Sequence, residues 1–149
     1  MALRLSRAIG TARRIELGYG VAVSVEPFSY AQFQAMQAAA LRLGRESLPA
    51  DMAVEVEAVD DEDLRPEIED RVRGDAAAHL LRLVLIRYGA GWEGLEDDAG
   101  APAPMTPDSI GHFLDLFPGV ATQLQHALLA PFHEVASEGN GSGPSLVTA

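Results

Sequence analysis

The chain contains 149 residues and carries a formal charge of −11, from 22 acidic and 11 basic side chains. Its length fits one domain with a modest core, and an apolar fraction of 48% excludes an intrinsically disordered composition. The sequence has no cysteine and no lysine, which excludes disulfides, thiolate catalysis, Schiff-base chemistry and a P-loop. These exclusions favour a small, acidic, soluble binding protein over an enzyme.

The charge is distributed unevenly along the chain. The first fourteen residues contain Arg4, Arg7, Arg13 and Arg14 and no acidic residue, whereas residues 46–70 contain about half of the acidic residues. A net-acidic surface repels DNA and anionic lipid, so we expect neither nucleic acid nor a membrane as a partner.

Both ends of the chain are predicted to lie outside the folded domain. Residues 1–13 lack the long apolar stretch of a secretory signal, and we expect a flexible or partner-ordered basic segment, with an organellar transit peptide as the alternative. Residues 137–149 are rich in Gly and Ser and are typical of a flexible tail. No stretch approaches the ~20 apolar residues of a membrane-spanning helix. A single domain is therefore expected over residues 14–136.

The first predicted element is a β-hairpin. Ile15 and Leu17 alternate with charged neighbours, and three valines alternate with other residues over 21–25. The segment Gly18-Tyr19-Gly20 separates the two runs and supplies the turn. Pro27 ends the second strand, because proline has no backbone donor for the ladder.

The next element is a helix over about residues 30–44. Ser29 is a typical N-cap, and Gln32 three residues later completes a capping box. Phe28 before the cap is spaced to pack on Phe33 as a hydrophobic staple. Apolar residues then follow helical spacing, and Gly44 marks the expected end of the helix.

Two elements are predicted in the acidic middle of the chain. Apolar residues alternate with acidic ones over residues 52–58, which predicts a third strand added to the hairpin. A long helix is expected over residues 66–88, with Pro66 in its first turn and a looser segment at Gly74. An apolar stripe over residues 80–85 marks the buried face of this helix.

Glycines at 89, 91 and 94 are predicted to stop this helix, and residues 96–104 to form a loop. Thr106 caps another helix that runs to about Leu116, with proline at its first position. Pro118 opens a last helix, which Pro131 kinks or ends. The predicted fold class is therefore α+β, an N-terminal β-hairpin or small antiparallel sheet followed by a bundle of about four helices.

No catalytic or metal-binding motif is present in the sequence. The histidines are His79, His112, His126 and His133, and none has the spacing of three or four residues that a helical metal pair needs. The acidic runs 60–63 and 96–100 do not match the alternating oxygen ligands of an EF-hand. We therefore predict no catalytic residue, no metal and no cofactor.

Trp92 is the single tryptophan and lies in a glycine-rich segment directly after an apolar helix. Two interpretations are open. The indole can be an exposed anchor for a partner, or it can fold back over the helix end with the help of Tyr88 and Leu95.

Residues 88–108 read YGAGWEGLEDDAGAPAPMTPD and resemble part of the tail assembly chaperones of tailed bacteriophages, prophages and gene transfer agents. Members of that family often carry a Trp-Glu-Gly-hydrophobic turn, an acidic loop with Gly, a Pro-x-Pro-hydrophobic-Thr/Ser step and two helices. The strand pair followed by Pro27-Phe28-Ser29 and a helix is similar to the opening of the family, so the resemblance covers about residues 14–136. The acidic segment 46–70, the Phe117-Pro118-Gly119 corner and the Gly/Ser tail depart from it.

The resemblance implies a non-catalytic function in the cytoplasm of a bacterial host. Such chaperones bind the helical tape-measure protein and recruit tail tube subunits, and self-association stays open. A tape-measure helix exposes apolar stripes that an acidic, soluble binder can cover. The residues expected to contact partners are Trp92, Tyr88, Leu95, Val120, Leu124 and Phe132.

Two other functions stay open from the sequence. One is a structural head–tail or minor tail component of a phage-like particle. The other is a small hydrolase or metal enzyme, which requires a pocket in which histidines or carboxylates converge.

Overall fold

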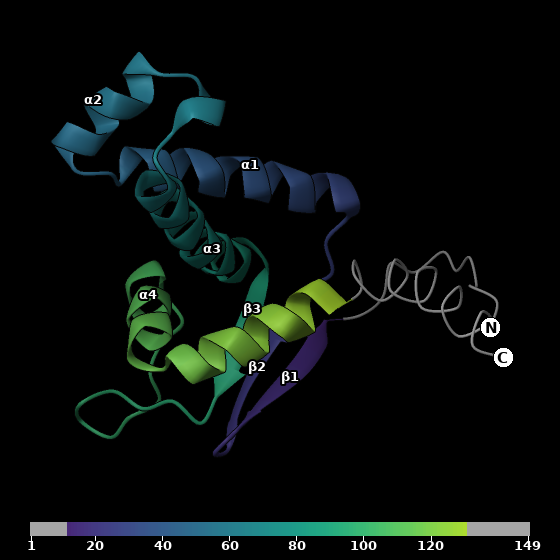
Figure 1. Ribbon diagram of the computed structural model, residues 1–149. Coiled ribbons are helices and arrows are strands. Elements are labelled where there is room, and N and C mark those ends of the chain that lie inside the picture. Colours follow the sequence, from purple (N-terminus) through teal and green to yellow (C-terminus); the bar gives the residue numbers. More distant parts are fainter. Residues whose placement is uncertain (1–11, 131–149) are drawn as a thin grey trace, which may run out of the picture.

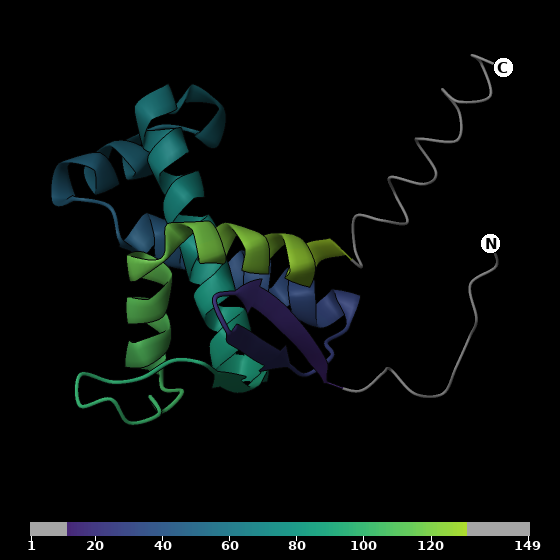
Figure 2. The same ribbon diagram turned by 90° about the horizontal axis from the view of Figure 1, so that it is seen from below.

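The structure is a computed structural model and describes residues 12–130. Its elements confirm the α+β class (Figures 1 and 2). They are β1 (Arg13–Gly18), β2 (Val21–Val25), α1 (Tyr30–Glu46), α2 (Ala50–Ala58), the 3-10 turn η1 (Asp61–Asp63), α3 (Pro66–Tyr88), β3 (Gly89–Glu93), α4 (Pro107–Leu116) and a last helix over residues 118–130.

The sheet has three antiparallel strands in the order β1-β2-β3. The predicted hairpin is confirmed, with positive φ angles at Gly18, Tyr19 and Gly20 in the turn. The long helix ends at Tyr88, before the glycines that were predicted to stop it, but residues 89–93 then form a third strand that the sequence did not predict. Backbone pairing with β2 holds β3, and its small side chains hide the alternation by which a strand is recognised.

The strand predicted over residues 52–58 is also wrong, because these residues form α2. Met52, Ala53 and Val56 share one face of the helix and pack on a small cluster formed by Leu48, Ile68 and Val72. Val54 points to solvent with 66% exposure, although strict alternation grouped it with Met52 and Val56. A helix and a strand compete for such a short apolar pattern, and here contact with α3 favours the helix.

A bidentate ion pair holds α2 to the start of α3. The Nε and Nη2 atoms of Arg65 donate to Glu55 at 2.7 and 2.8 Å. The hydrogen bond with Glu55 raises the pKa of Arg65 above its usual value. Arg65 therefore stays charged, and it fixes the acidic segment against the long helix.

Helix α1 begins as predicted and ends later than predicted. The Ser29–Gln32 capping box is confirmed, and the Phe28 and Phe33 rings stack with centroids 6.4 Å apart. Gly44 does not end the helix, which continues to Glu46. Gly44 lies where α1 crosses α3, and a Cβ atom there would be 2.9 Å from the Val72 carbonyl oxygen. This glycine is required by close helix packing and not by helix termination.

Helix α3 follows its prediction from Pro66 to Tyr88 and continues through Gly74 without a break. It runs through the middle of the molecule, between α1 and the sheet (Figure 1). Helix α4 also has the predicted bounds, and its Thr106 cap forms a capping box with Ser109. The last helix begins at residue 118, and Pro131, Phe132 and the predicted tail lie outside the described residues.

One main core joins the sheet to four helices. Its fully buried side chains come from β2, α1, α3, α4 and the last helix, and they include Val23, Met36, Leu85, Ile110 and Leu124. On the outer face of the sheet, Arg14 of β1 donates to Glu93 of β3 at 2.9 Å. It reaches across β2 over the short side chains of Ala22 and Ser24. This hydrogen bond raises the pKa of Arg14 above its usual value.

Gly44→Ala is expected to destabilise the protein by about 1–3 kcal/mol, because the new methyl group forces α1 away from α3. Gly74→Ala is the matched control, since a Cβ atom there meets nothing within 4 Å. It should stabilise the protein by up to about 1 kcal/mol through helix propensity. Chemical denaturation measures both variants, and a gain in stability for Gly44→Ala would contradict the close crossing.

Candidate binding groove

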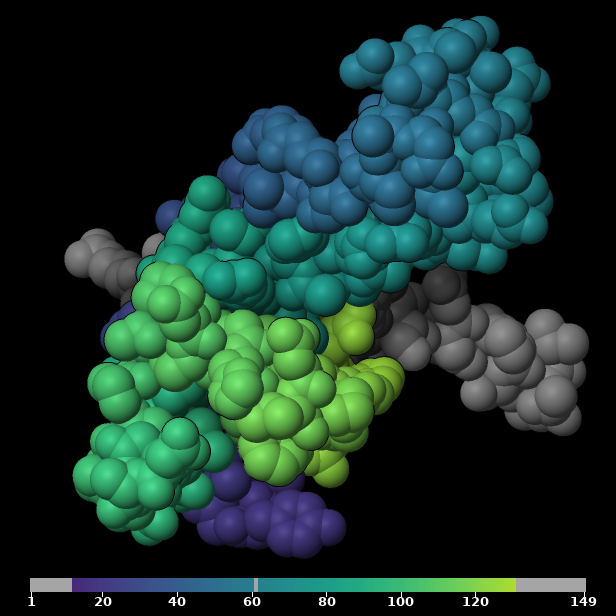
Figure 3. Space-filling model, turned by 90° about the vertical axis from the view of Figure 1, so that its left-hand side faces the viewer, coloured from purple at the N-terminus to yellow at the C-terminus, as the bar shows by residue number. Residues whose placement is uncertain are grey.

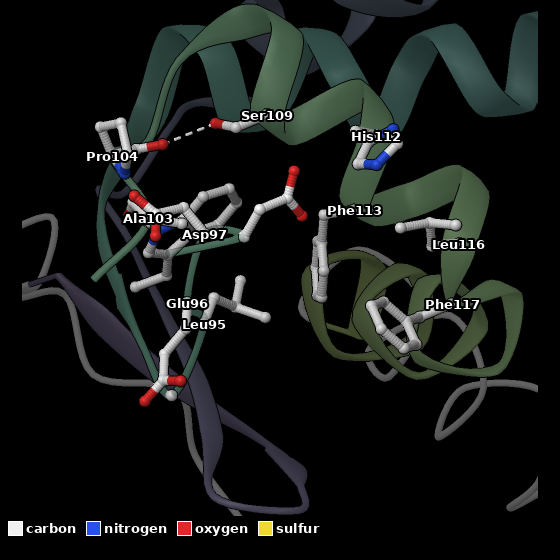
Figure 4. Close-up of a pocket in the computed structure, with 13 residues that line it drawn as sticks. Leu95, Glu96, Asp97, Ala103, Pro104, Ser109, His112, Phe113, Leu116 and Phe117 are labelled. Atoms are coloured by element: carbon white, nitrogen blue, oxygen red, sulfur yellow. Dashed lines mark hydrogen bonds between the residues drawn. The ribbon is translucent and has the colours of Figure 1, made fainter. Parts of the chain in front are cut away.

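A groove of about 500 Å³ lies between α4 and the loop of residues 94–104. Figure 3 shows the face on which this loop and α4 lie next to each other, and Figure 4 shows the side chains that line the hollow. We call it the α4 groove. Its apolar lining is made by Trp92, Leu95, Phe113, Leu116 and Phe117, and its acidic rim by Glu96, Asp97 and Asp98.

The loop wall of the groove is ordered by its own hydrogen bonds. Ala103 N donates to Leu95 O at 2.9 Å, and Asp97 N donates to Ala101 O at 2.8 Å. The Asp97 carboxylate accepts from the backbone N–H groups of Ala99 and Ala101 at 2.9 and 3.0 Å. The loop is thus a closed, hairpin-like structure, and Asp97 acts as its internal cap.

A second set of contacts fixes the loop to α4. Ser109 Oγ donates to Pro104 O at 2.6 Å, as the dashed line in Figure 4 shows. The same side chain completes the capping box with Thr106. The start of α4 and the end of the loop are therefore held by one hydroxyl group.

Trp92 joins both walls of the groove to the core. Its Nε1 atom donates to Ala103 O at 2.7 Å, and its ring meets the Phe113 ring edge-on with centroids 5.6 Å apart. Strand pairing places Trp92 opposite Val23 on the core side of the sheet. The indole is half-buried, so it folds back over the core and also contributes to the groove lining.

Two large apolar side chains that line the groove and are exposed lie at the end of α4. Leu116 is 57% exposed and Phe117 is 48% exposed. The Phe117 ring packs on Phe113 with centroids 5.9 Å apart, which holds it at the groove. Neither residue was singled out from the sequence, where Phe117 appeared as part of a corner. The sequence feature that could have indicated them is a pair of large apolar residues directly before Pro118. These two residues do not belong to the buried face of the helix.

The rim of the groove is negatively charged on the loop side. Glu96 and Asp98 are exposed, and neither forms an ion pair or hydrogen bond with any residue in the described range 12–130. His112 lies on the α4 side and is also exposed. The groove can therefore offer apolar contact on its floor and carboxylates to a cation at its edge.

The other sequence-predicted contact residues do not gather in this groove. Tyr88 is half-buried and packs on Phe28 with ring centroids 5.2 Å apart. Val120 is half-buried on the last helix, and Leu124 is fully buried in the main core. Phe132 lies outside the described residues. The structure thus brings Trp92 and Leu95 together and leaves Tyr88, Val120 and Leu124 as supporting residues of the core.

Each histidine in the described range has a different environment. His79 shares a hydrogen bond with Ser47 Oγ at 3.1 Å, His112 lines the α4 groove, and His126 is exposed on the last helix. Among residues 12–130, no three His, Asp or Glu side chains come together to hold a metal ion. Within the same range, no helix has both the length and the apolar character of a membrane span.

Comparison with family models, curated proteins and solved structures gave no match for this chain.

Asp97→Ala is expected to loosen the loop wall, because two backbone N–H groups lose their acceptor. Each of these hydrogen bonds contributes a net stabilisation of about 0.5–1.5 kcal/mol. Hydrogen exchange at the Ala99 and Ala101 amides should accelerate by about tenfold. Asp98→Ala is the control, since this carboxylate caps no amide of the loop, and it should leave the exchange unchanged. Equal exchange in the two variants would contradict the role of Asp97.

Proposed function

We propose that this protein is a non-catalytic, phage-type tail assembly chaperone that binds the tape-measure protein and recruits tail tube subunits in the bacterial cytoplasm. The observation that carries the proposal is the α4 groove, where Leu116 and Phe117 are exposed beside an acidic rim. The resemblance of residues 88–108 to that family supports it, because the same segment builds Trp92, the loop and the start of α4.

The groove offers what an apolar helix stripe requires. An amphipathic helix binds by placing its apolar residues into a groove lined with apolar side chains. Here Phe113 forms the buried floor, while Leu116 and Phe117 extend the apolar surface outward. Burial of one large apolar side chain contributes about 1.5–3 kcal/mol, so a few such contacts give a specific but reversible complex.

The acidic surface fits the same function. A protein that exposes an apolar groove risks association with misfolded chains that expose apolar and acidic side chains. A net charge of −11 and the carboxylates beside the groove oppose such contacts. The chain can thus stay in solution while it presents an apolar surface to its partner.

The double variant Leu116→Gln/Phe117→Gln is expected to weaken binding to the tape-measure protein of the same phage or prophage by at least about tenfold, because it removes apolar burial. Calorimetry or co-purification with tape-measure fragments measures this effect. The full-length protein is used, and its thermal unfolding is recorded to verify that each variant is folded.

The matched control is Leu41→Gln/Val54→Gln. Leu41 is 42% exposed and lines a second groove of about 510 Å³ beside α1 and α3, and Val54 is 66% exposed on α2. This control should bind like the unmodified chain. If the unmodified, folded chain binds neither the tape-measure protein nor the tube protein, the proposed function is wrong. If only the control loses binding, the function stands and the surface is misplaced.

A structural head–tail or minor tail component makes the opposite prediction about mature particles. We expect the chain to be absent from purified particles, because a chaperone leaves the tape-measure protein when the tube closes around it. Quantitative mass spectrometry of particles and of the cell lysate measures this. A fixed copy number in mature particles would replace the chaperone with a structural component.

A further inference from the structure

We infer that the α4 groove also binds residues 1–11 of a second copy of this chain, so that two copies exchange their basic N-terminal segments. This inference does not depend on the proposed function, because it concerns contacts between identical chains. It rests on the chemistry of the groove, the composition of the segment and the position of β1 in the sheet.

The groove has a negative charge next to an apolar surface, and part of this charge has no partner among residues 12–130. Asp97 is used by its own loop, where it accepts two backbone hydrogen bonds. Glu96 and Asp98 have no such partner within residues 12–130, and they stand beside Leu95 in the lining. A ligand that fits has an apolar side chain next to a guanidinium group.

Residues 1–11 have this composition. The segment MALRLSRAIGT contains Arg4 and Arg7, three large aliphatic residues and no acidic residue. In an extended chain, Leu3 and Leu5 would face the groove floor while Arg4 points to the rim. Over residues 3–5 the alternation of apolar and basic side chains thus matches the floor and the rim, and Arg7, on the same side as the leucines, adds a second positive charge beyond them.

The remaining arginines of the basic N-terminal run already have partners. Arg14 donates to Glu93 and Glu16, and Arg13 donates to Ala127 O at 3.0 Å. Both contacts lie within one copy and fix the start of β1. Arg4 and Arg7 are the other two arginines of the basic run, and the inference assigns them to the carboxylates of the rim.

The sheet topology favours a segment from a second copy. The N-terminal segment enters the sheet at Arg13, at the end where Val25 pairs with both Arg13 and Gly89. The groove loop begins at the opposite end of β3, after Glu93. β1 and β3 are also at opposite edges of the sheet. Eleven extended residues reach about 36–40 Å, and a path back along β1 and across the sheet would use most of this length. A second copy supplies the segment without that path.

The first experiment measures the dimer by sedimentation velocity of the full chain over a range of concentrations. We expect a monomer–dimer equilibrium that weakens at high salt. Arg4→Glu/Arg7→Glu and Glu96→Arg/Asp98→Arg should each weaken the dimer by about tenfold, as expected for the loss and reversal of two ion pairs. Combining all four substitutions should restore the dimer. Glu62→Arg/Asp63→Arg, on the acidic segment, is the control and should leave it unchanged.

A monomer at every concentration would overturn the inference. So would a dimer that neither reversal weakens, or a combined variant that stays monomeric. Restoration by the combined variant separates a broken contact from a misfolded chain, because misfolding caused by one reversal would not be repaired by the other.

The second experiment identifies which copy supplies the segment. The chain has no cysteine, so Ser6→Cys provides a unique site for a spin label. Labelled, unenriched protein is mixed with unlabelled, ¹⁵N-enriched protein, and Glu57→Cys on α2 is the control site. We expect broadening of the Leu95, Leu116 and Phe117 amides in the mixture with Ser6→Cys only. Broadening that occurs only when label and enrichment are on the same chain would overturn the second-copy assignment.

Discussion

Helix α3 has buried residues in two separate stretches, and each stretch packs against a different part of the chain. The arrangement of the other elements depends on these two contacts. Near its start, Ile68 and Val72 pack with Leu48 in the small cluster beneath α2. Further along, Leu81, Val84 and Leu85 enter the main core shared with the sheet, α4 and the last helix. One helix therefore fixes the acidic segment at one end and delivers the chain into β3 at the other. Because β3 pairs with β2, the position of Trp92 follows from the position of α3.

The α4 groove is a consequence of that arrangement. Phe113 of α4 and Leu95 of the loop line the groove (Figure 4). Trp92 of β3 also lines it, so three elements converge on one hollow. The Trp92 hydrogen bond to Ala103 and the Ser109 hydrogen bond to Pro104 hold the loop against the helix. A wall that is closed by such bonds keeps its shape without a partner, which reduces the entropic cost of binding.

Local chemistry made much of the fold predictable. Helix starts were predictable from N-cap residues and from proline at the first helical position, namely Ser29, Thr106, Pro66 and Pro107. These residues act within one helical turn, so their effect does not depend on distant contacts. The failures have the opposite cause. The helix at α2 is favoured by contact with Ile68 and Val72, and β3 is held by backbone pairing with a distant hairpin. Part of the groove was predictable, because Trp92 and Leu95 belong to a recognisable segment of the sequence. Leu116 and Phe117 were missed, because their exposure depends on how α4 packs against the core.

We propose that the α4 groove is the surface by which this chain binds its partner. Titration of the ¹⁵N-enriched full chain with a tape-measure segment, followed by amide chemical shifts, measures which residues are in contact. We expect the perturbed amides to gather in residues 94–104 and 109–117. Perturbations confined to the second groove beside α1 and α3, or to residues 46–70, would contradict the account.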